Sequence, residues 1–315
     1  MTMANRVRHS YDAHMNTLAS TTSRPVTLLG LPPLIVLCLA ATWLVWGSTY
    51  LAIKFALVSF PPFFQMGTRF LVAGAMLMVW VRWRGAAWPD RTQWRNAVVI
   101  GTLMLGAGMG GTAYAEMTIG SGLVVAFIAV MPLMIAALNL LWGVRPRALE
   151  AVGIVVGLVG VLMLTQGAGF QASKAGLIAQ TLACSGWALG SVLSQRSLPL
   201  APGATGFASE MLCGGAVLMA MSALSGEAPA WPPQPAAVAA WFYLVVFGSL
   251  VAFNAYMLLL ARAPAALASS YTFVNPVIAM LLGVAIAGEH VSAFEWGAVS
   301  VVLAGVLLLL WRRSR

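Results

Sequence analysis

Charged residues are scarce in this chain of 315 residues: Asp, Glu, Lys and Arg make up 8% of it, whereas hydrophobic residues make up 61%. About a quarter of the residues in an ordinary soluble domain are charged, so this composition excludes a soluble globular fold. Apolar runs of about 20 residues, the length that crosses a bilayer as a helix, recur along the chain. The sequence therefore predicts an all-α membrane protein with the lipid bilayer as its partner.

Cysteine and histidine are also rare, with three of each. The cysteines Cys38, Cys184 and Cys213 all fall in apolar segments, where an odd number forms neither a disulfide framework nor a zinc-ligand spacing. The histidines lie outside the apolar runs, and the motifs GxxxxGK[ST], HExxH and GxSxG are absent. We therefore expect no cofactor, no metal and no catalytic residue, and an intramembrane enzyme is only a distant alternative.

Charges, prolines and polar loops divide the apolar sequence into ten predicted transmembrane helices. The predicted spans are residues 33–58, 64–83, 94–115, 119–142, 147–165, 175–195, 204–224, 236–259, 264–287 and 292–311. Residues 1–32 are largely polar and rich in Ser and Thr, and we interpret them as a disordered tail. An even number of spans places both termini on the same side of the membrane.

Basic residues are distributed very unevenly over the loops between these spans. Fourteen arginines fall on the side of the termini, whereas Lys174 is the one clear loop cation on the other side. Under the positive-inside rule both termini are cytoplasmic. Because the arginines form short separate clusters and not one basic face, no nucleic-acid partner is expected. The abundance of Ala, Gly and Arg suggests a bacterial source, and hence the inner membrane.

The two halves of the chain share a pattern at an offset of 141 to 145 residues. The matches include Gly47-Ser48 with Gly190-Ser191, Gly74-Ala75 with Gly215-Ala216, Ala113-Tyr114 with Ala255-Tyr256, Pro132 with Pro276, and Gly160 with Gly305. Five spans per half is an odd number, so the second half enters the membrane from the opposite side. This predicts an inverted 5+5 repeat, which is typical of secondary transporters.

Four segments resemble one transporter family. These are "WGSTYLAIKFA", "RFLVAGAML", "MPLMIAALNLLWG" and "YTFVNPVIAMLLGVAIAGE", and together they resemble the EamA family of the drug/metabolite transporter superfamily, most closely its aromatic amino acid exporter group. Gly143-Val144-Arg145 departs from that pattern, because the first repeat lacks the acid of Gly288-Glu289. The resemblance implies an exporter of small solutes with EamA repeats at residues 33–165 and 175–311 and a central cavity.

Polar and aromatic residues near the middle of the spans are the candidate substrate-binding residues, because such groups face a bundle interior or a wet cavity. They are Trp46, Tyr50, Met131, Trp187, Asn254, Tyr271 and Asn275. Pro132 and Pro276 are the candidate hinges, since each frees a carbonyl about four residues earlier; a plain packing kink is the alternative. No permanent charge is expected at the middle of the spans.

Rings, a thioether and amides suit a small amphipathic zwitterion. We therefore predict export of neutral or aromatic amino acids by alternating access, with a broad-specificity drug or metabolite carrier as the alternative. Lys54 and Glu116 are expected near the outer ends of their spans, where an ion pair of Lys54 with Glu116 or a loop acid would help to close an outer gate; a lysine that only snorkels to the interface is the other interpretation. The sequence leaves open whether the protein works as a monomer.

Overall fold

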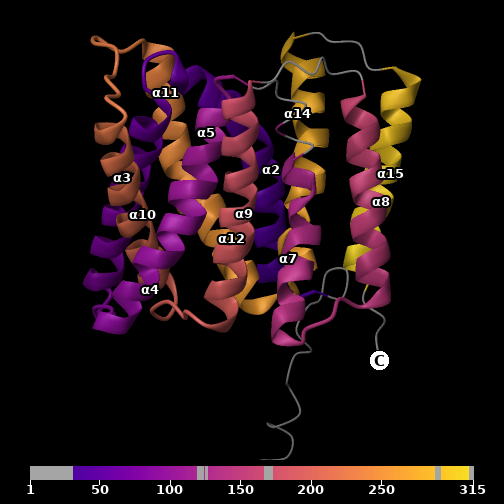
Figure 1. Ribbon diagram of the computed structural model, residues 1–315, viewed down its shortest axis with the longest axis horizontal. Helices are drawn as coiled ribbons and strands as arrows, with labels where there is room; N and C mark the ends of the chain where they lie inside the picture. Colours follow the sequence, from indigo (N-terminus) through magenta and orange to yellow (C-terminus); the bar gives the residue numbers. More distant parts are fainter. Residues whose placement is uncertain (1–30, 119–123, 125–126, 167–172, 288–291, 312–315) are drawn as a thin grey trace, which may run out of the picture.

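The structure is a computed structural model that describes residues 31–118, 124, 127–166, 173–287 and 292–311. All its regular elements are helices, and most of them stand side by side (Figure 1). They are α2 (Pro33–Leu57), α3 (Pro62–Trp83), α4 (Arg91–Gly101), η1 (Thr102–Gly110), α5 (Gly111–Ala115), α7 (Met131–Asn139), η2 (Leu140–Trp142), α8 (Ala148–Thr165), α9 (Lys174–Arg196), α10 (Ala204–Leu224), α11 (Pro235–Tyr243), η3 (Leu244–Phe253), α12 (Asn254–Arg262), α13 (Ala265–Ala268), α14 (Tyr271–Ala287) and α15 (Ala293–Leu310).

These elements confirm the predicted fold class. Six helices in the described part of the chain are long and apolar enough to cross a membrane, and three shorter apolar helices accompany them. The segments α4, η1 and α5 form one continuous span, as do α11, η3 and α12. The described elements therefore follow the order of the ten expected spans. All but the last two residues of the expected tail lie outside the described residues.

Prolines and caps begin the helices where the sequence turns from loop to span. Pro33, Pro62 and Pro235 occupy the first turn of α2, α3 and α11, where the missing N–H has no intrahelical role and the fixed φ suits the helix. Asp90 accepts from the backbone N–H of Gln93, whose side chain accepts from the N–H of Asp90, so α4 begins with a capping box.

The helices α3 and α10 pack with a reciprocal geometry that reveals a twofold relation. A Cβ added to Gly74 would lie 3.0 Å from the backbone nitrogen of Leu212, and one added to Gly215 would lie 2.9 Å from that of Leu71. Gly74 and Leu71 are matched by Gly215 and Leu212 at the same offset, so each contact is the image of the other.

The helices α8 and α15 repeat this geometry on the other side of the molecule (Figure 1). A Cβ on Gly160 would lie 2.7 Å from the nitrogen of Val302, and one on Gly305 would lie 2.5 Å from that of Gly157. Further along, Gly153 faces Leu309, so residue numbers fall on α15 as they rise on α8. Antiparallel helices that exchange equivalent contacts require a twofold axis across the helices, which confirms the inverted repeat.

Two π-helices occupy equivalent places in the halves. The segment η1 lies in the third span and η3 in the eighth, and their first residues, Thr102 and Leu244, are separated by the offset of the repeat. A π-helix is uncommon at this length and is frequently found at functional sites. Both segments border the centre of the molecule, since η1 packs against α9 and η3 packs against α2.

The two expected proline kinks differ in form. Pro132 lies in the first turn of α7, directly after a turn at Val130, so the helical segment starts anew at this point. The backbone of α14 is helical on both sides of Pro276, whose side chain lies outside the described residues. The hinge role of both prolines remains a prediction.

The glycine contacts between α8 and α15 predict different outcomes for two substitutions in one helix. Gly305→Ala should destabilise the protein by about 1–3 kcal/mol, because its methyl group would meet backbone atoms that cannot move aside. Gly297→Ala, where nothing lies within 4 Å of the added atom, should leave stability unchanged or raise it. The melting temperature of the detergent-purified protein measures both, and equal melting temperatures for the two variants would contradict the packing argument.

Candidate functional site

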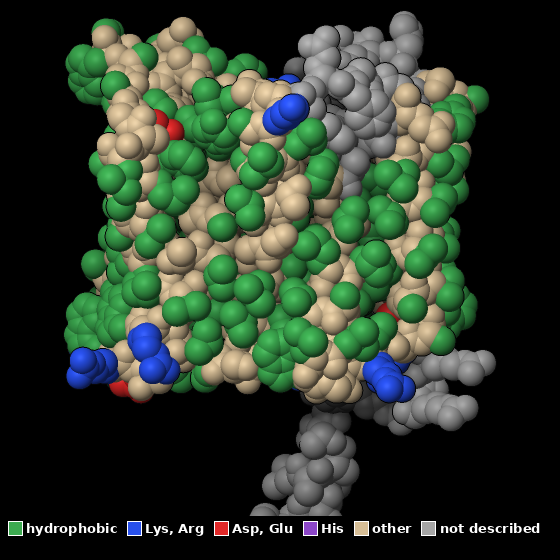
Figure 2. Space-filling model, viewed as in Figure 1, with side chains coloured by type: hydrophobic (Ala, Val, Ile, Leu, Met, Phe, Trp, Pro, Cys, Tyr) green, Lys and Arg blue, Asp and Glu red, His purple; other side chains and the backbone are tan. Residues whose placement is uncertain are grey.

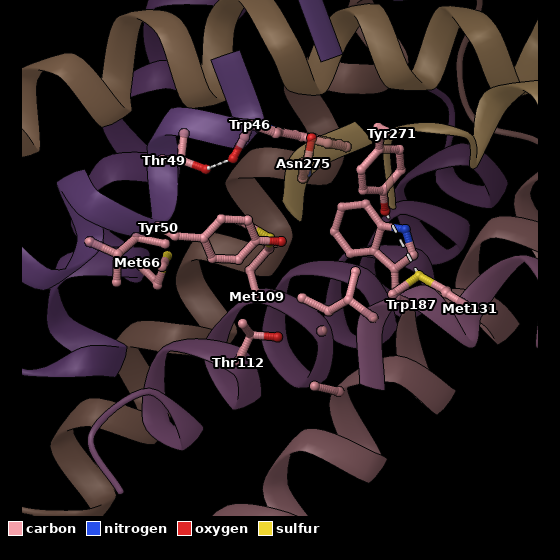
Figure 3. A pocket seen from close by; sticks show the side chains of 14 residues that line it. Trp46, Thr49, Tyr50, Met66, Met109, Thr112, Met131, Trp187, Tyr271 and Asn275 are labelled. Atoms are coloured by element: carbon pink, nitrogen blue, oxygen red, sulfur yellow. Dashed lines mark hydrogen bonds between the residues drawn. The ribbon is translucent and has the colours of Figure 1, made fainter. Parts of the chain in front are cut away.

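A cavity at the centre of the bundle brings together six of the seven candidate residues. Its volume, taken as the space that the centre of a water-sized molecule can occupy, is about 50 Å³. The lining includes Trp46 and Tyr50 from α2, Met131 from α7, Trp187 from α9, and Tyr271 and Asn275 from α14, as Figure 3 shows. Both repeats therefore contribute side chains to one site, as an inverted-repeat transporter requires.

Four rings form a packed cluster along one wall of this cavity. The ring of Trp46 lies 4.7 Å from that of Tyr271 and 5.6 Å from that of Trp187, both edge to face. Tyr256 of α12 completes the cluster, with centroids 5.3 Å from Trp46 and 5.2 Å from Trp187. Edge-to-face contacts of this kind add about 0.5–1.5 kcal/mol per pair beyond the area that they bury.

Hydrogen bonds fix the polar edges of these rings. Trp187 Nε1 donates to Tyr256 Oη at 3.0 Å, and that hydroxyl lies 2.9 Å from Ser191 Oγ. Trp46 Nε1 donates to the carbonyl of Gly248 at 3.2 Å. Since each buried indole N–H has a partner, the cluster is a rigid wall that needs no ligand to satisfy it.

Asn275 and Tyr271 connect α14 to the helices on either side. With its amide oriented to suit its neighbours, Asn275 Nδ2 donates to the carbonyls of Tyr271 at 3.1 Å and Trp43 at 3.2 Å. The hydroxyl of Tyr271 lies 3.8 Å from the sulfur of Met131. The polar edge of the cavity is therefore held by α2, α7 and α14 together.

Asn254 does not line this cavity, so the expectation that it does is wrong. Its Nδ2 donates to the carbonyls of Leu250 at 2.8 Å and Ser249 at 3.3 Å within its own span. It borders a separate apolar groove between α2, α3, α10 and α12. Asn254 directly follows the π-helix η3, in which a turn takes about one more residue than in an α-helix. The side chain of Asn254 therefore points in another direction than α-helical spacing predicts.

Lys54 and Glu116 border a second pocket at the end of the molecule where α2 and α5 finish. They lie about one turn beyond Tyr50 and Thr112, which line the central cavity on the same two spans. Neither carboxylate oxygen of Glu116 has a hydrogen-bond partner within the described residues. No hydrogen bond joins Lys54 to Glu116, and their pairing at an outer gate remains a prediction, although both side chains border the same pocket.

Sequence reasoning missed several residues of the site. Thr49, Met66, Met109 and Thr112 also line the cavity. Thr112 and Met109 precede Glu116 by four and seven residues, a helical spacing that could have placed them on one face. Tyr256 is fully buried in the ring cluster. Its match to Tyr114 in the other repeat could have marked it as a candidate residue.

A permanent charge is present at mid-span, contrary to expectation. The side chain of Arg69 is fully buried, and its Nε donates at 2.9 Å to Ser249 Oγ, near the middle of the span Pro235–Arg262. Glu210 of α10, its counterpart in the second repeat, is also fully buried. A guanidinium can reach inward by its long stem, so the backbone position of Arg69 in the first half of α3 was misleading.

Charge at the two ends of the molecule differs. Figure 2 shows the described basic side chains of this face at the two ends, with hydrophobic side chains between. The end with the loop between α3 and α4 carries eight described arginines: Arg82, Arg84, Arg91, Arg95, Arg145, Arg147, Arg196 and Arg262. At the opposite end the described cations are Lys54 and Lys174.

Comparison with known proteins places this architecture among transporters. The model of the EamA-like transporter family matches the chain twice, at residues 33–166 and 174–311. An uncharacterized inner membrane transporter of Escherichia coli, YedA, is 39% identical over 272 residues, which cover 86% of this chain and 89% of the relative. An uncharacterized transporter of Synechocystis is 27% identical over 311 residues, covering 88% and 90% of the two chains.

A crystal structure with 21% sequence identity shares the fold. It superposes with a TM-score of 0.72 and covers 87% of this chain and 95% of its own. Protein PecM of Dickeya dadantii is 25% identical over 268 residues, covering 84% of this chain and 88% of its own. The matches extend over both halves, so the similarity to these proteins covers most of the bundle.

The ring cluster predicts unequal effects for one chemical change at two equivalent positions. Tyr256→Phe removes the hydroxyl that accepts from Trp187 and contacts Ser191, and the buried indole N–H then loses its partner at a cost of about 1–3 kcal/mol. Tyr114→Phe, at the matched position in the first repeat, changes a ring that is 37% exposed and should cost little. Thermal unfolding followed by tryptophan fluorescence compares them, and similar melting temperatures for both variants would contradict this account.

Proposed function

Because the chain belongs to the EamA-like transporter family, we propose that it exports small amphipathic metabolites, chiefly neutral or aromatic amino acids, across the inner membrane by alternating access. The observation that carries this proposal is the convergence of rings, thioethers and an amide from both repeats on one cavity. Aromatic faces and methionine sulfur contact an apolar side chain, while Thr49, Thr112 and Asn275 offer hydrogen bonds to a polar end.

The twofold packing supports alternating access. The two halves are antiparallel copies of one five-helix unit and make equivalent contacts with each other. A conformation in which the two halves exchange their roles therefore has a similar energy, so the cavity can open to either side in turn. We assign Lys54 and Glu116 to the outer entrance, because they lie about one turn beyond the cavity residues Tyr50 and Thr112 on α2 and α5 and border a second pocket. Pro132 and Pro276 are the proposed hinges within α7 and α14.

The orientation of the chain follows from the charge at its two ends. The arginine-rich end holds the loop between α3 and α4 and the starts of α2 and α8. With that end in the cytoplasm, both termini are cytoplasmic, and Lys54 and Lys174 lie on the outer side.

This orientation predicts the behaviour of reporter fusions. Alkaline phosphatase needs disulfides that do not form in the cytoplasm, so a fusion at the C-terminus should be inactive, and a fluorescent protein placed there should fluoresce. A phosphatase fusion truncated after Ser173, in the loop that precedes α9, should be active and serves as the control. An active phosphatase at the C-terminus would place the arginine-rich end outside and contradict the assignment.

The cavity predicts which of two asparagines matters for transport. In proteoliposomes that exchange labelled phenylalanine, tryptophan, methionine or threonine, Asn275→Ala should raise the apparent KM by about tenfold, the cost of roughly one hydrogen bond to a charged group. Asn254→Ala, which changes a side chain outside the cavity, should leave KM within about twofold of the unchanged protein.

Competition among unlabelled compounds then separates the two transporter proposals. Strong competition by a few neutral amino acids supports the amino-acid exporter. Equal competition by chemically unrelated drugs supports a broad-specificity carrier, and chemical conversion of the labelled compound would indicate an enzyme. Unchanged KM in Asn275→Ala would remove this residue from the binding site.

A further inference from the structure

Arg69 is the largest fully buried side chain of the described part of the protein. Its guanidinium stacks on the ring of Phe70, with Cζ 4.6 Å from the ring centroid, and Nε donates to Ser249. The other two nitrogens, Nη1 and Nη2, have no hydrogen-bond partner among the described residues. Surrounding groups enclose both nitrogens, so the hydrogen-bonding capacity at the end of the guanidinium fork is unused within the described chain.

An arrangement of this kind is costly inside a membrane protein. A guanidinium stays charged under ordinary conditions, and removal of an ion from water costs several kcal/mol unless an opposite charge or hydrogen bonds compensate. Glu210, the buried acid at the matching position, does not compensate it, since both of its oxygens also lack hydrogen-bond partners within the described residues.

The unpartnered end of Arg69 lies directly behind the wall of the central cavity. A Cβ on Gly248 would lie 3.4 Å from Nη2 of Arg69 and 3.5 Å from Cγ2 of Thr49, so these two side chains approach the same glycine. Thr49 lines the cavity, and so does Met66, which lies one turn before Arg69 on α3. The carbonyl of Gly248 accepts from Trp46 of the ring cluster.

We propose that Arg69 is the subsite for the carboxylate of the transported molecule, a role that rests on the proposed function of the cavity. Ser249 holds Nε, which leaves Nη1 and Nη2 to make the paired end-on hydrogen bonds that suit a planar carboxylate. The ring cluster contacts the apolar side chain at the same time. The lack of a Cβ at Gly248 leaves room for the guanidinium to turn past Thr49 toward the ligand.

Matched ligand pairs test this assignment on the intact protein. Binding of phenylalanine, tryptophan, methionine and threonine to the purified protein is compared with binding of the corresponding amino acid amides, which keep the side chain and the amine but lose the negative charge. The unchanged protein should bind the preferred acid about tenfold or more tightly than its amide, as hydrogen bonds to a charged group predict. An acid-to-amide affinity ratio near one would overturn the assignment without any variant.

Three variants then show which residue distinguishes the acid from the amide. Arg69→Gln should weaken binding of the acid while the affinity for the amide stays within about twofold, so the acid-to-amide affinity ratio falls to about one. Arg69→Lys, which keeps the charge without the fork, should restore only part of this ratio. Glu210→Gln, which neutralises the buried charge at the matching position of the other repeat, should leave the ratio unchanged.

The possible results distinguish this inference from the proposed function. Equal loss of acid and amide binding in Arg69→Gln, measured on protein that retains its melting profile, means a structural role and overturns the subsite. If Arg69→Gln does not fold, Ser249→Ala, which frees Nε, should lower the ratio, and an unchanged ratio there also overturns it. Failure of every acid and every amide to bind the unchanged protein contradicts the proposed function itself.

Discussion

Close approach of antiparallel helices at glycine is the constraint on which the rest of this structure depends. In lipid the helices gain little from hydrophobic burial against one another, so association relies on tight van der Waals contact between backbones. Gly74 and Gly215 each face the backbone of the partner helix in the pair α3 and α10, and Gly160 and Gly305 do so in the pair α8 and α15. Within each pair the two helices are related by a twofold axis. These pairs, α3 with α10 and α8 with α15, join the halves on either side. The cavity is lined by residues of α2, α3, η1, α5, α7, α9 and α14.

The spans, the repeat and the inversion could be predicted from the sequence because they depend on depth and order alone. A helix rises about 1.5 Å per residue, so the position of Trp46, Trp187 or Asn275 along its span fixes its level in the bilayer. The direction in which a side chain points is harder to predict, because a span that is apolar all round gives no amphipathic face to read. Asn254 was misplaced because the π-helix η3, which ends directly before it, changes the helical spacing on which such a face would be judged.

Long ionisable side chains are the second place where sequence reasoning fell short. The stem of Arg69 spans several ångströms, so the backbone level of Arg69 in the first half of α3 does not tell where its charge lies. Lys54 and Glu116 border one pocket but share no hydrogen bond, because a shared level does not fix the distance between two flexible side chains. Contacts of this kind depend on tertiary packing, which periodicity does not encode.

The inverted repeat gives the backbone a symmetry that the side chains break. Arg69 and Glu210 occupy matching positions on α3 and α10, and both are fully buried, yet one carries a positive charge and the other a negative one. The ring cluster is also unequal, since Tyr256 is buried within it while Tyr114 at the matching position is partly exposed. A symmetric backbone lets the two open states have similar energy. The unequal side chains let a single site bind an asymmetric molecule in one orientation, because a cavity with equivalent halves would have no preference between its two ends.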